Sequence, residues 1–218
     1  LRLSRGLGDV YKRQLQDKLP PFSKKEAEKI IIENLGQSNF EDIIDLSDPI
    51  AAASIAQVHK AKIKEDNTIK NVAIKVLRPE IERAFQRDID TFYFAARLVE
   101  FVSPKSRRLK PMDVIAHFDG VVRGELDLRL ESASASEFLA NISQDKGFSV
   151  PSVNWSLSSR RVMTLDWADG VPMGDTDALL AAGHNLSELG DRVLHMFLNH
   201  ALSCLLYTSP SPRDSRRS

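Results

Sequence analysis

The sequence predicts an α+β fold in which helices pack on a small antiparallel sheet. Residues 54–63 and 71–76 alternate between apolar and polar side chains on either side of the polar turn Glu65-Asp66-Asn67, which is typical of a β-hairpin. Residues 81–102 repeat apolar side chains at helical spacing and predict a long amphipathic helix after Pro79. With 218 residues, of which 42% are hydrophobic, the chain can bury the core of one domain or of two small lobes.

The first predicted element is a short amphipathic helix that begins at Ser23. Ser23 and Glu26 have the spacing of a capping box, in which each side chain bonds the backbone of the other residue. The pattern stops at Gly36, a residue type that is common just beyond a helix end. Between them, apolar side chains recur at helical spacing: Ala27, Ile30, Ile31 and Leu35.

Further elements follow the long helix. Residues 112–141 have a helical pattern in which Gly120 and Gly124 are candidate breaks. Residues 150–153 and 161–166 then predict two strands, and residues 186–202 predict a last helix.

A run of mostly small side chains, Ala51-Ala52-Ala53-Ser54-Ile55, leads into the first predicted strand. Such a loop lets backbone N–H groups approach phosphate oxygens, and a lysine on a following strand, here Lys75, reaches the same phosphates as a point charge. This layout predicts a nucleotide-binding hairpin in which alanine replaces the usual glycine. Each pattern alone is equally compatible with closely packed alanines and a solvated strand lysine.

Three acidic residues, Glu125, Asp127 and Glu131, lie in one predicted helical region. At 100° per residue, Asp127 and Glu131 share a helix face, whereas Glu125 lies about a third of a turn from Glu131. Because a phosphate-binding lysine is held by a carboxylate on the neighbouring helix, Glu131 is the expected partner of Lys75, with Asp127 in support. The alternative is a solvated helix face with acids beside Arg129.

Four segments together resemble the UbiB family of atypical protein-kinase-like proteins of ubiquinone biosynthesis: PIAAASIAQVHKA, VAIKVLRPEI, ELDLRLESASASEFLAN and RVMTLDWADGVPM. The resemblance covers about residues 15–203. It implies a kinase-like small lobe over residues 15–170, with only the start of the helical large lobe over 171–203. It also implies ATP or ADP with Mg²⁺ as the cofactor, and an atypical kinase or ATPase as the parent enzyme.

The same resemblance implies roles for particular residues. Backbone groups of the Asp166-Trp167-Ala168 linker would hydrogen-bond an adenine edge, although a Trp-Ala-Asp-Gly segment is otherwise most often a plain turn. Glu125-x-Asp127 resembles the regulatory ExD motif of the family. The partner of that motif, an N-terminal Lys-x-Gly-Gln segment, is absent from this sequence.

The catalytic and metal-binding motifs of the family are also missing from the sequence. The family continues from a segment like 197–203 into a catalytic loop with aspartate and asparagine and then into a metal-binding Asp-Phe-Gly, but only Asp214 follows here. Phosphoryl transfer needs Mg²⁺ and a carboxylate that orients the nucleophile, so we expect a truncated, inactive chain without Mg²⁺ ligands. His195 and His200 are poorly spaced for a shared metal, and His59 is expected at the surface of its strand.

The two ends of the sequence, residues 1–14 and 204–218, lack hydrophobic periodicity and are expected to be adapter-like, non-native tails. They hold seven basic and two acidic residues, which leaves 23 basic and 28 acidic residues and a net charge of −5 between them. This mildly acidic remainder argues against a nucleic-acid partner. The only cysteine is Cys204, so disulfides and cysteine-based zinc sites are excluded.

The resemblance implies a parent protein that is peripheral to the cytoplasmic face of the inner membrane. No apolar run approaches the roughly 20 residues of a transmembrane helix. Besides adenine nucleotide, lipid and ubiquinone-biosynthesis proteins are the implied partners. Two alternatives stay open: a non-catalytic, pseudokinase-like module that binds lipid or a biosynthetic complex, and a small-molecule phosphotransferase of the aminoglycoside or choline kinase type. The alanine-rich loop and the ExD motif argue against the second.

Overall fold

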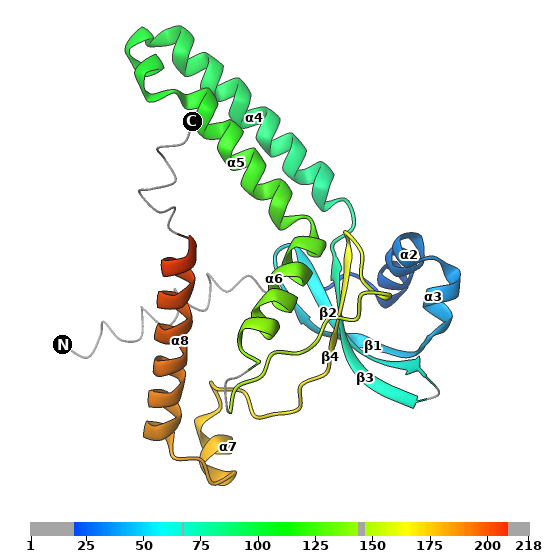
Figure 1. The fold of residues 1–218 in the computed structure, drawn as a ribbon. Helices are drawn as coiled ribbons and strands as arrows, with labels where there is room; N and C mark the ends of the chain where they lie inside the picture. Colours follow the sequence, from blue (N-terminus) through cyan, green and yellow to red (C-terminus); the bar gives the residue numbers. More distant parts are fainter. Residues whose placement is uncertain (1–19, 67, 144–146, 209–218) are drawn as a thin grey trace, which may run out of the picture. The chain divides into compact units, whose positions relative to one another are not determined.

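The structure is a computed structural model that describes residues 20–66, 68–143 and 147–208 (Figure 1). The chain divides into two compact units, the first ending at Ala168 and the second beginning at Asp169. The expected lobe boundary at residue 170 stays a prediction. The expected N-terminal tail and residues 209–218 with Asp214 lie outside the described residues.

The first unit contains a four-stranded antiparallel sheet with the strand order β1-β2-β3-β4. Its strands are β1 (Ile43–Ala52), β2 (Ala56–Glu65), β3 (Thr68–Leu77) and β4 (Val162–Asp166). The predicted hairpin is β2–β3, which turns at Asp66 in the left-handed conformation (φ 46°). The sheet and its helices confirm the α+β fold class.

Helices cover both faces of the sheet (Figure 1). Because side chains alternate along β3, Val72, Ile74 and Val76 enter one core with α2 (Lys24–Leu35). Leu77 enters a second core on the opposite face, beneath α6 (Leu128–Asn141). This face also carries Lys75, so the alternation along one strand separates the main core from the candidate site.

The first helices follow the capping signals of the sequence. Ser23 Oγ accepts from the N–H of Glu26 at 3.3 Å, and the Glu26 carboxylate accepts from the N–H of Ser23 at 3.1 Å, which confirms the capping box. Helix α2 ends at Leu35, and Gly36 takes a positive φ of 84° between α2 and α3 (Gln37–Glu41).

Helix α4 (Ile81–Val102) matches its predicted range and packs against α5 (Pro111–Glu125) in a helical hairpin closed by the 3-10 helix η1 (Pro104–Leu109). The break before α6 (Leu128–Asn141) lies at Leu126-Asp127, not at the glycines expected to break the helix. Gly120 and Gly124 both lie inside α5, because packing against α4 outweighs their low helix propensity.

Two strand predictions need correction. Residues 150–153 do not form a strand, because only Val153 makes an isolated bridge, to Leu165 of β4. Conversely, β1 was not expected, since its register is interrupted on both sides of Pro49 and the alternation that marks a strand is lost there.

The second unit contains α7 (Thr176–Ala181) and α8 (Leu186–Thr208). The predicted last helix, 186–202, is confirmed, and α8 continues beyond it to Thr208. None of the helices in the described part of the chain combines the length and hydropathy that a membrane span requires.

The expectation that His59 lies at the surface is wrong. Its side chain is fully buried, and its Nδ1 donates to the Ser47 carbonyl at 2.8 Å. That donor fixes the neutral tautomer, so His59 Nε2 accepts from Gln57 Nε2 at 2.9 Å. The Gln57 amide also brackets the Phe22 backbone, accepting from its N–H at 3.0 Å and donating to its carbonyl at 3.2 Å. Strand β2 is thereby fixed to the segment that leads into α2.

Burial lowers the pKa of His59 from its ordinary value of 6.5, and the positive charge of Lys24 lowers it further. The hydrogen bond to the Ser47 carbonyl and the negative charges of Asp48 and Glu28 act in the opposite direction but do not outweigh burial. A protonated ring would also direct a second N–H at the Gln57 amide.

We therefore expect the free energy of unfolding to fall as the pH drops below about 6.5, because the unfolded chain then binds a proton that the folded chain excludes. The loss should continue down to the lowered pKa. Urea unfolding at pH 7.5 and 5.5 measures it, with His59→Gln as the comparison. An equal pH dependence in both proteins would contradict the assignment to His59.

Candidate nucleotide site

The centre of the candidate site is an ion pair between β3 and α6. Lys75 Nζ lies 2.7 Å from Oε1 and 2.6 Å from Oε2 of Glu131. The two side chains are 28% and 50% exposed, so solvent screens the pair and its contribution to stability is small. Its main effect is to hold the lysine ammonium in one place at the surface of the sheet.

Glu131 reaches Lys75 because of the way α6 begins. Leu128, the first residue of α6, is 1% exposed and packs with Leu77 and Met163 against the sheet. Its N–H donates to the Arg160 carbonyl at 2.9 Å, which anchors the start of the helix. Glu131 lies one turn further along the same helix face, at the edge of this core.

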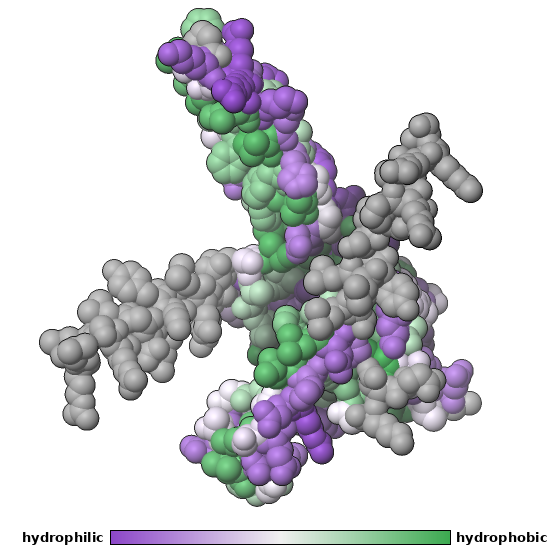
Figure 2. Space-filling view, turned by 60° about the vertical axis from the view of Figure 1, so that its left-hand side comes forward, coloured by the Kyte–Doolittle hydropathy of each residue, from purple (hydrophilic) through white to green (hydrophobic). Residues whose placement is uncertain are grey.

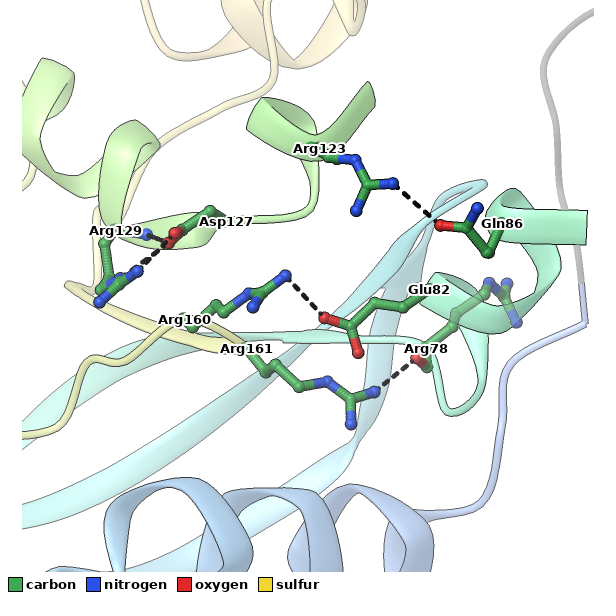
Figure 3. Close-up of polar contacts among 8 residues, drawn as sticks. All are labelled: Arg78, Glu82, Gln86, Arg123, Asp127, Arg129, Arg160 and Arg161. Carbon is green, nitrogen blue, oxygen red and sulfur yellow. Dashed lines mark hydrogen bonds and ion pairs between the residues drawn. The ribbon is translucent and has the colours of Figure 1, made fainter. Parts of the chain in front are cut away.

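The expected helix face shared by Asp127 and Glu131 is wrong. Asp127 has an extended backbone (φ −121°, ψ 93°) and is the N-cap of α6, so helical spacing does not apply to it. Its carboxylate accepts from the backbone N–H of Arg129 at 3.1 Å and from the guanidinium at 2.6 and 2.9 Å (Figure 3). These bonds from Arg129 lower the pKa of Asp127. Glu125 ends α5 and so belongs to a different helix from Glu131.

The alanine loop is shorter than expected. Ala51 and Ala52 belong to β1, opposite Val58 and Gln57 of β2, and do not form part of the loop. The turn is residues 53–55, closed by a hydrogen bond of 2.8 Å from the Ala53 N–H to the Ala56 carbonyl. No residue of this turn has a positive φ among those that the structure describes, so alanine fits where glycine is usual.

The turn presents free donors at the same end of the sheet as Lys75. Lys75 lies opposite Val58, and Ile55 lies three residues beyond Val58, about 10 Å along the strand. Within the described residues, no hydrogen bond occupies the N–H groups of Ser54 and Ile55. Two backbone donors and one ammonium are the chemistry that binds a polyphosphate.

The linker after β4 is partly occupied by bonds within the lobe. The N–H of Asp166 donates to the Ser152 carbonyl at 2.9 Å, and the N–H of Trp167 donates to the Asn71 carbonyl at 3.1 Å. Lys60 Nζ lies 4.3 Å from the centre of the Trp167 ring, which holds the linker against the sheet. The expected adenine contacts therefore fall to the Asp166 carbonyl and to the backbone of Ala168, and they stay a prediction.

The described residues contain no group of three or more His, Cys, Asp or Glu side chains arranged to hold a metal ion. The donors around Lys75 thus fit the phosphates of a nucleotide but do not by themselves fit Mg²⁺. We assign no step to a metal at this site.

Sequence reasoning missed three arginines: Arg78, which contacts the turn, and Arg160 and Arg161, which precede β4. Each bonds backbone carbonyls or a carboxylate of a distant element. A single sequence carries no signal for such contacts, because an arginine beside a strand end is more often solvated.

A tight turn above a strand lysine, with that lysine held by a glutamate from the covering helix, defines a protein-kinase-like small lobe. Comparison with known families agrees. The model of the ABC1 atypical kinase-like domain matches residues 14–206, and the chain therefore belongs to this family.

Curated relatives carry the name "Probable protein kinase UbiB". The protein of Marinobacter nauticus is 35% identical over 85% of this chain, and that of Vibrio cholerae is 37% identical over 84%. The protein of Azotobacter vinelandii is 35% identical over 84% of the chain. In all three cases the match spans only 34% of the relative's length.

Proposed function

We propose that this chain is the nucleotide-binding part of a UbiB-like atypical kinase or ATPase, and that it holds the phosphates of ATP or ADP between Lys75 and the turn at residues 53–55. The observation that carries this function is the two-bond contact of Lys75 with Glu131. In protein kinases such a pair positions the lysine on the phosphates. The glutamate holds the ammonium in position through two hydrogen bonds, while the lysine retains a third N–H for a phosphate oxygen.

For the whole protein we propose a role in ubiquinone biosynthesis, with phosphoryl transfer or ATP hydrolysis as the chemistry. The name of the relatives supports the kinase class. In the whole protein we propose Mg²⁺ as the accompanying ion, which would supply charge neutralisation to the phosphates. For this chain we propose binding alone.

Titration of the 218-residue chain with ATP, ADP and AMP, each with and without Mg²⁺, tests the proposed function by calorimetry. ATP and ADP should bind at least tenfold more tightly than AMP, because a charge-assisted hydrogen bond to the additional phosphates contributes about 1.5–3 kcal/mol. Equal affinity for all three nucleotides, or no binding by the folded chain, would contradict it.

We also propose that the parent protein meets the membrane surface through the tip of the α4–α5 hairpin. Three apolar side chains are exposed there, Phe101 (81%), Val102 (71%) and Leu109 (75%). Four exposed basic residues lie in the same segment of the chain: Lys105, Arg107, Arg108 and Lys110. Figure 2 shows the green apolar flank of the hairpin with purple side chains at its tip. Apolar anchors among basic residues are typical of binding to anionic lipid, which favours the peripheral placement implied by the resemblance.

Co-sedimentation with vesicles measures this contact. The chain should bind vesicles that contain phosphatidylglycerol and should not bind purely zwitterionic vesicles. The double substitution Arg107→Gln and Arg108→Gln should weaken binding about 30-fold, because each lost charge removes about 1 kcal/mol. Ile69→Ser, which removes an exposed apolar side chain at the β2–β3 turn, is the control and should change nothing. Equal binding to both vesicle types would contradict the assignment.

A further inference from the structure

Arg78 bonds the carbonyl groups of the turn at residues 53–55. It is the first residue after β3, and its N–H donates to the Ile55 carbonyl at 2.9 Å. Its Nε donates to the Ala53 carbonyl at 3.1 Å, and its Nη1 donates to the Pro20 carbonyl at 3.0 Å. Two carbonyls of the three-residue turn are therefore bonded to one arginine.

These bonds determine where the free donors of the turn point. In a trans peptide unit the C=O and the N–H point in opposite directions. The Ala53 carbonyl and the Ser54 N–H belong to the same peptide unit, so a carbonyl held by Arg78 directs the Ser54 N–H to the opposite side. The Ser54 donor is thereby directed away from Arg78.

Arg161 fixes Arg78 in turn. Arg161 Nη2 donates to the Arg78 carbonyl at 2.9 Å, and the Arg161 carbonyl accepts from the Leu77 N–H at 3.0 Å (Figure 3). The backbone of Arg78 is thus fixed by Ile55 through its N–H and by Arg161 through its carbonyl, which restricts where its guanidinium can lie.

The neighbouring Arg160 extends this connection to the helices. Its guanidinium pairs with Glu82 of α4 at 3.1 Å, and its carbonyl accepts the Leu128 N–H that begins α6 (Figure 3). Glu131 lies one turn further along α6. The dipeptide Arg160-Arg161 therefore connects Arg78, which bonds the turn, to the helix that carries Glu131.

We propose that Arg78 is a positioning residue that presents the Ser54 N–H to nucleotide phosphates, and that Arg160-Arg161 couples this turn to the Lys75–Glu131 pair. This role of Arg78 rests on the proposed function. It explains how a turn of alanine, serine and isoleucine, without glycine, can hold one conformation suited to phosphate: the guanidinium supplies several donors in a fixed geometry and keeps the Ala53 carbonyl on its own side.

The test compares Arg78→Gln and Arg78→Lys with the wild-type chain. Lysine keeps the charge but cannot bond the Ala53 and Pro20 carbonyls in the same geometry, so both variants should act alike. Arg83→Gln is the matched control, because Arg83 is an exposed arginine whose partner, Glu80, belongs to no part of the site. Two readouts are taken for each protein: hydrogen exchange of the Ala53 N–H, and the affinities for ATP and for AMP.

Both Arg78 variants should lose protection of the Ala53 N–H and bind ATP about tenfold more weakly, with AMP affinity nearly unchanged, because the lost donor serves the outer phosphates. Unchanged protection and ATP affinity would overturn the role of Arg78. So would an equal loss for ATP and AMP, which indicates a general loss of structure. Failure of the wild-type chain to bind ATP would instead overturn the proposed function, and the two failures are therefore distinguishable.

Discussion

Replacing Lys75 with alanine is expected to weaken ATP binding about 10- to 100-fold, the range for loss of a charge-assisted hydrogen bond. The physical reason is specific to phosphate. Glu131 holds the Lys75 ammonium near the end of the sheet. With alanine at position 75, only the backbone N–H groups of the turn would remain to bind phosphate. Calorimetric titration of the 218-residue chain with ATP measures the change.

The matched control is Lys70→Ala. Lys70 lies on the same strand, is exposed, and also forms an ion pair, with Glu65 at the other end of the hairpin. Its removal should leave ATP affinity unchanged. Because solvent partly screens the Lys75–Glu131 pair, its loss should cost less than about 1 kcal/mol of stability, and unfolding cannot account for the loss of binding. ATP affinity that is equal in both variants would remove Lys75 from the site.

The substitution Glu131→Gln tests whether the glutamate affects ATP binding through its negative charge or through the position in which it holds Lys75. Glutamine can still accept one hydrogen bond from Lys75, so we expect a smaller loss of ATP affinity than for Lys75→Ala. The two substitutions together should be no worse than Lys75→Ala alone, since the glutamate acts only through the lysine.

The contact between Lys75 and Glu131 could be anticipated because a phosphate-binding lysine is held by a carboxylate on the neighbouring helix, and the structure shows the short-range regularities that bring the two together. Alternation along a regular strand places Lys75 on the helix-covered face, and a buried leucine three residues earlier places Glu131 above it. Asp127 shows the limit of that reasoning. We assumed helical periodicity for Asp127, but the helix before it has its C-cap at Leu126, which is 3% exposed. Asp127 is instead the N-cap of α6, and in that geometry its carboxylate bonds Arg129.

The alanine turn shows a second limit. Tiny side chains indicate close packing but do not say whether the backbone is a loop or a strand, and irregular pairing around Pro49 hid the strand that contains Ala51 and Ala52. What determines the conformation of the turn is Arg78, 25 residues away from Ala53 in the sequence. No local pattern encodes such a contact, and tertiary structure was needed to find it.

Replacing Gln57 with alanine is expected to cost about 2–4 kcal/mol of unfolding free energy, because buried groups left without a partner cost about 1–3 kcal/mol each. The substitution removes the partner of His59 Nε2 and both partners of the Phe22 backbone. Gln57 and His59 are fully buried, so water cannot replace the lost bonds at the ring. Phe22 is only partly buried, which limits the total.

Urea unfolding at pH 7.5 measures this cost against Gln86→Ala. Gln86 is exposed on α4 and bonds Arg123 at 2.9 Å, so it is a glutamine of the same size in a solvated network, and its removal should cost less than about 0.5 kcal/mol. A cost below 1 kcal/mol for Gln57→Ala, or one equal to that of the control, would show that the β2 network does not hold the segment before α2. Because a ring without its Gln57 donor tolerates protonation better, Gln57→Ala should also weaken the loss of stability below pH 6.5. Gln57 therefore affects both the stability of the fold and its pH dependence, and the two measurements test the same network of Gln57, His59 and the Phe22 backbone.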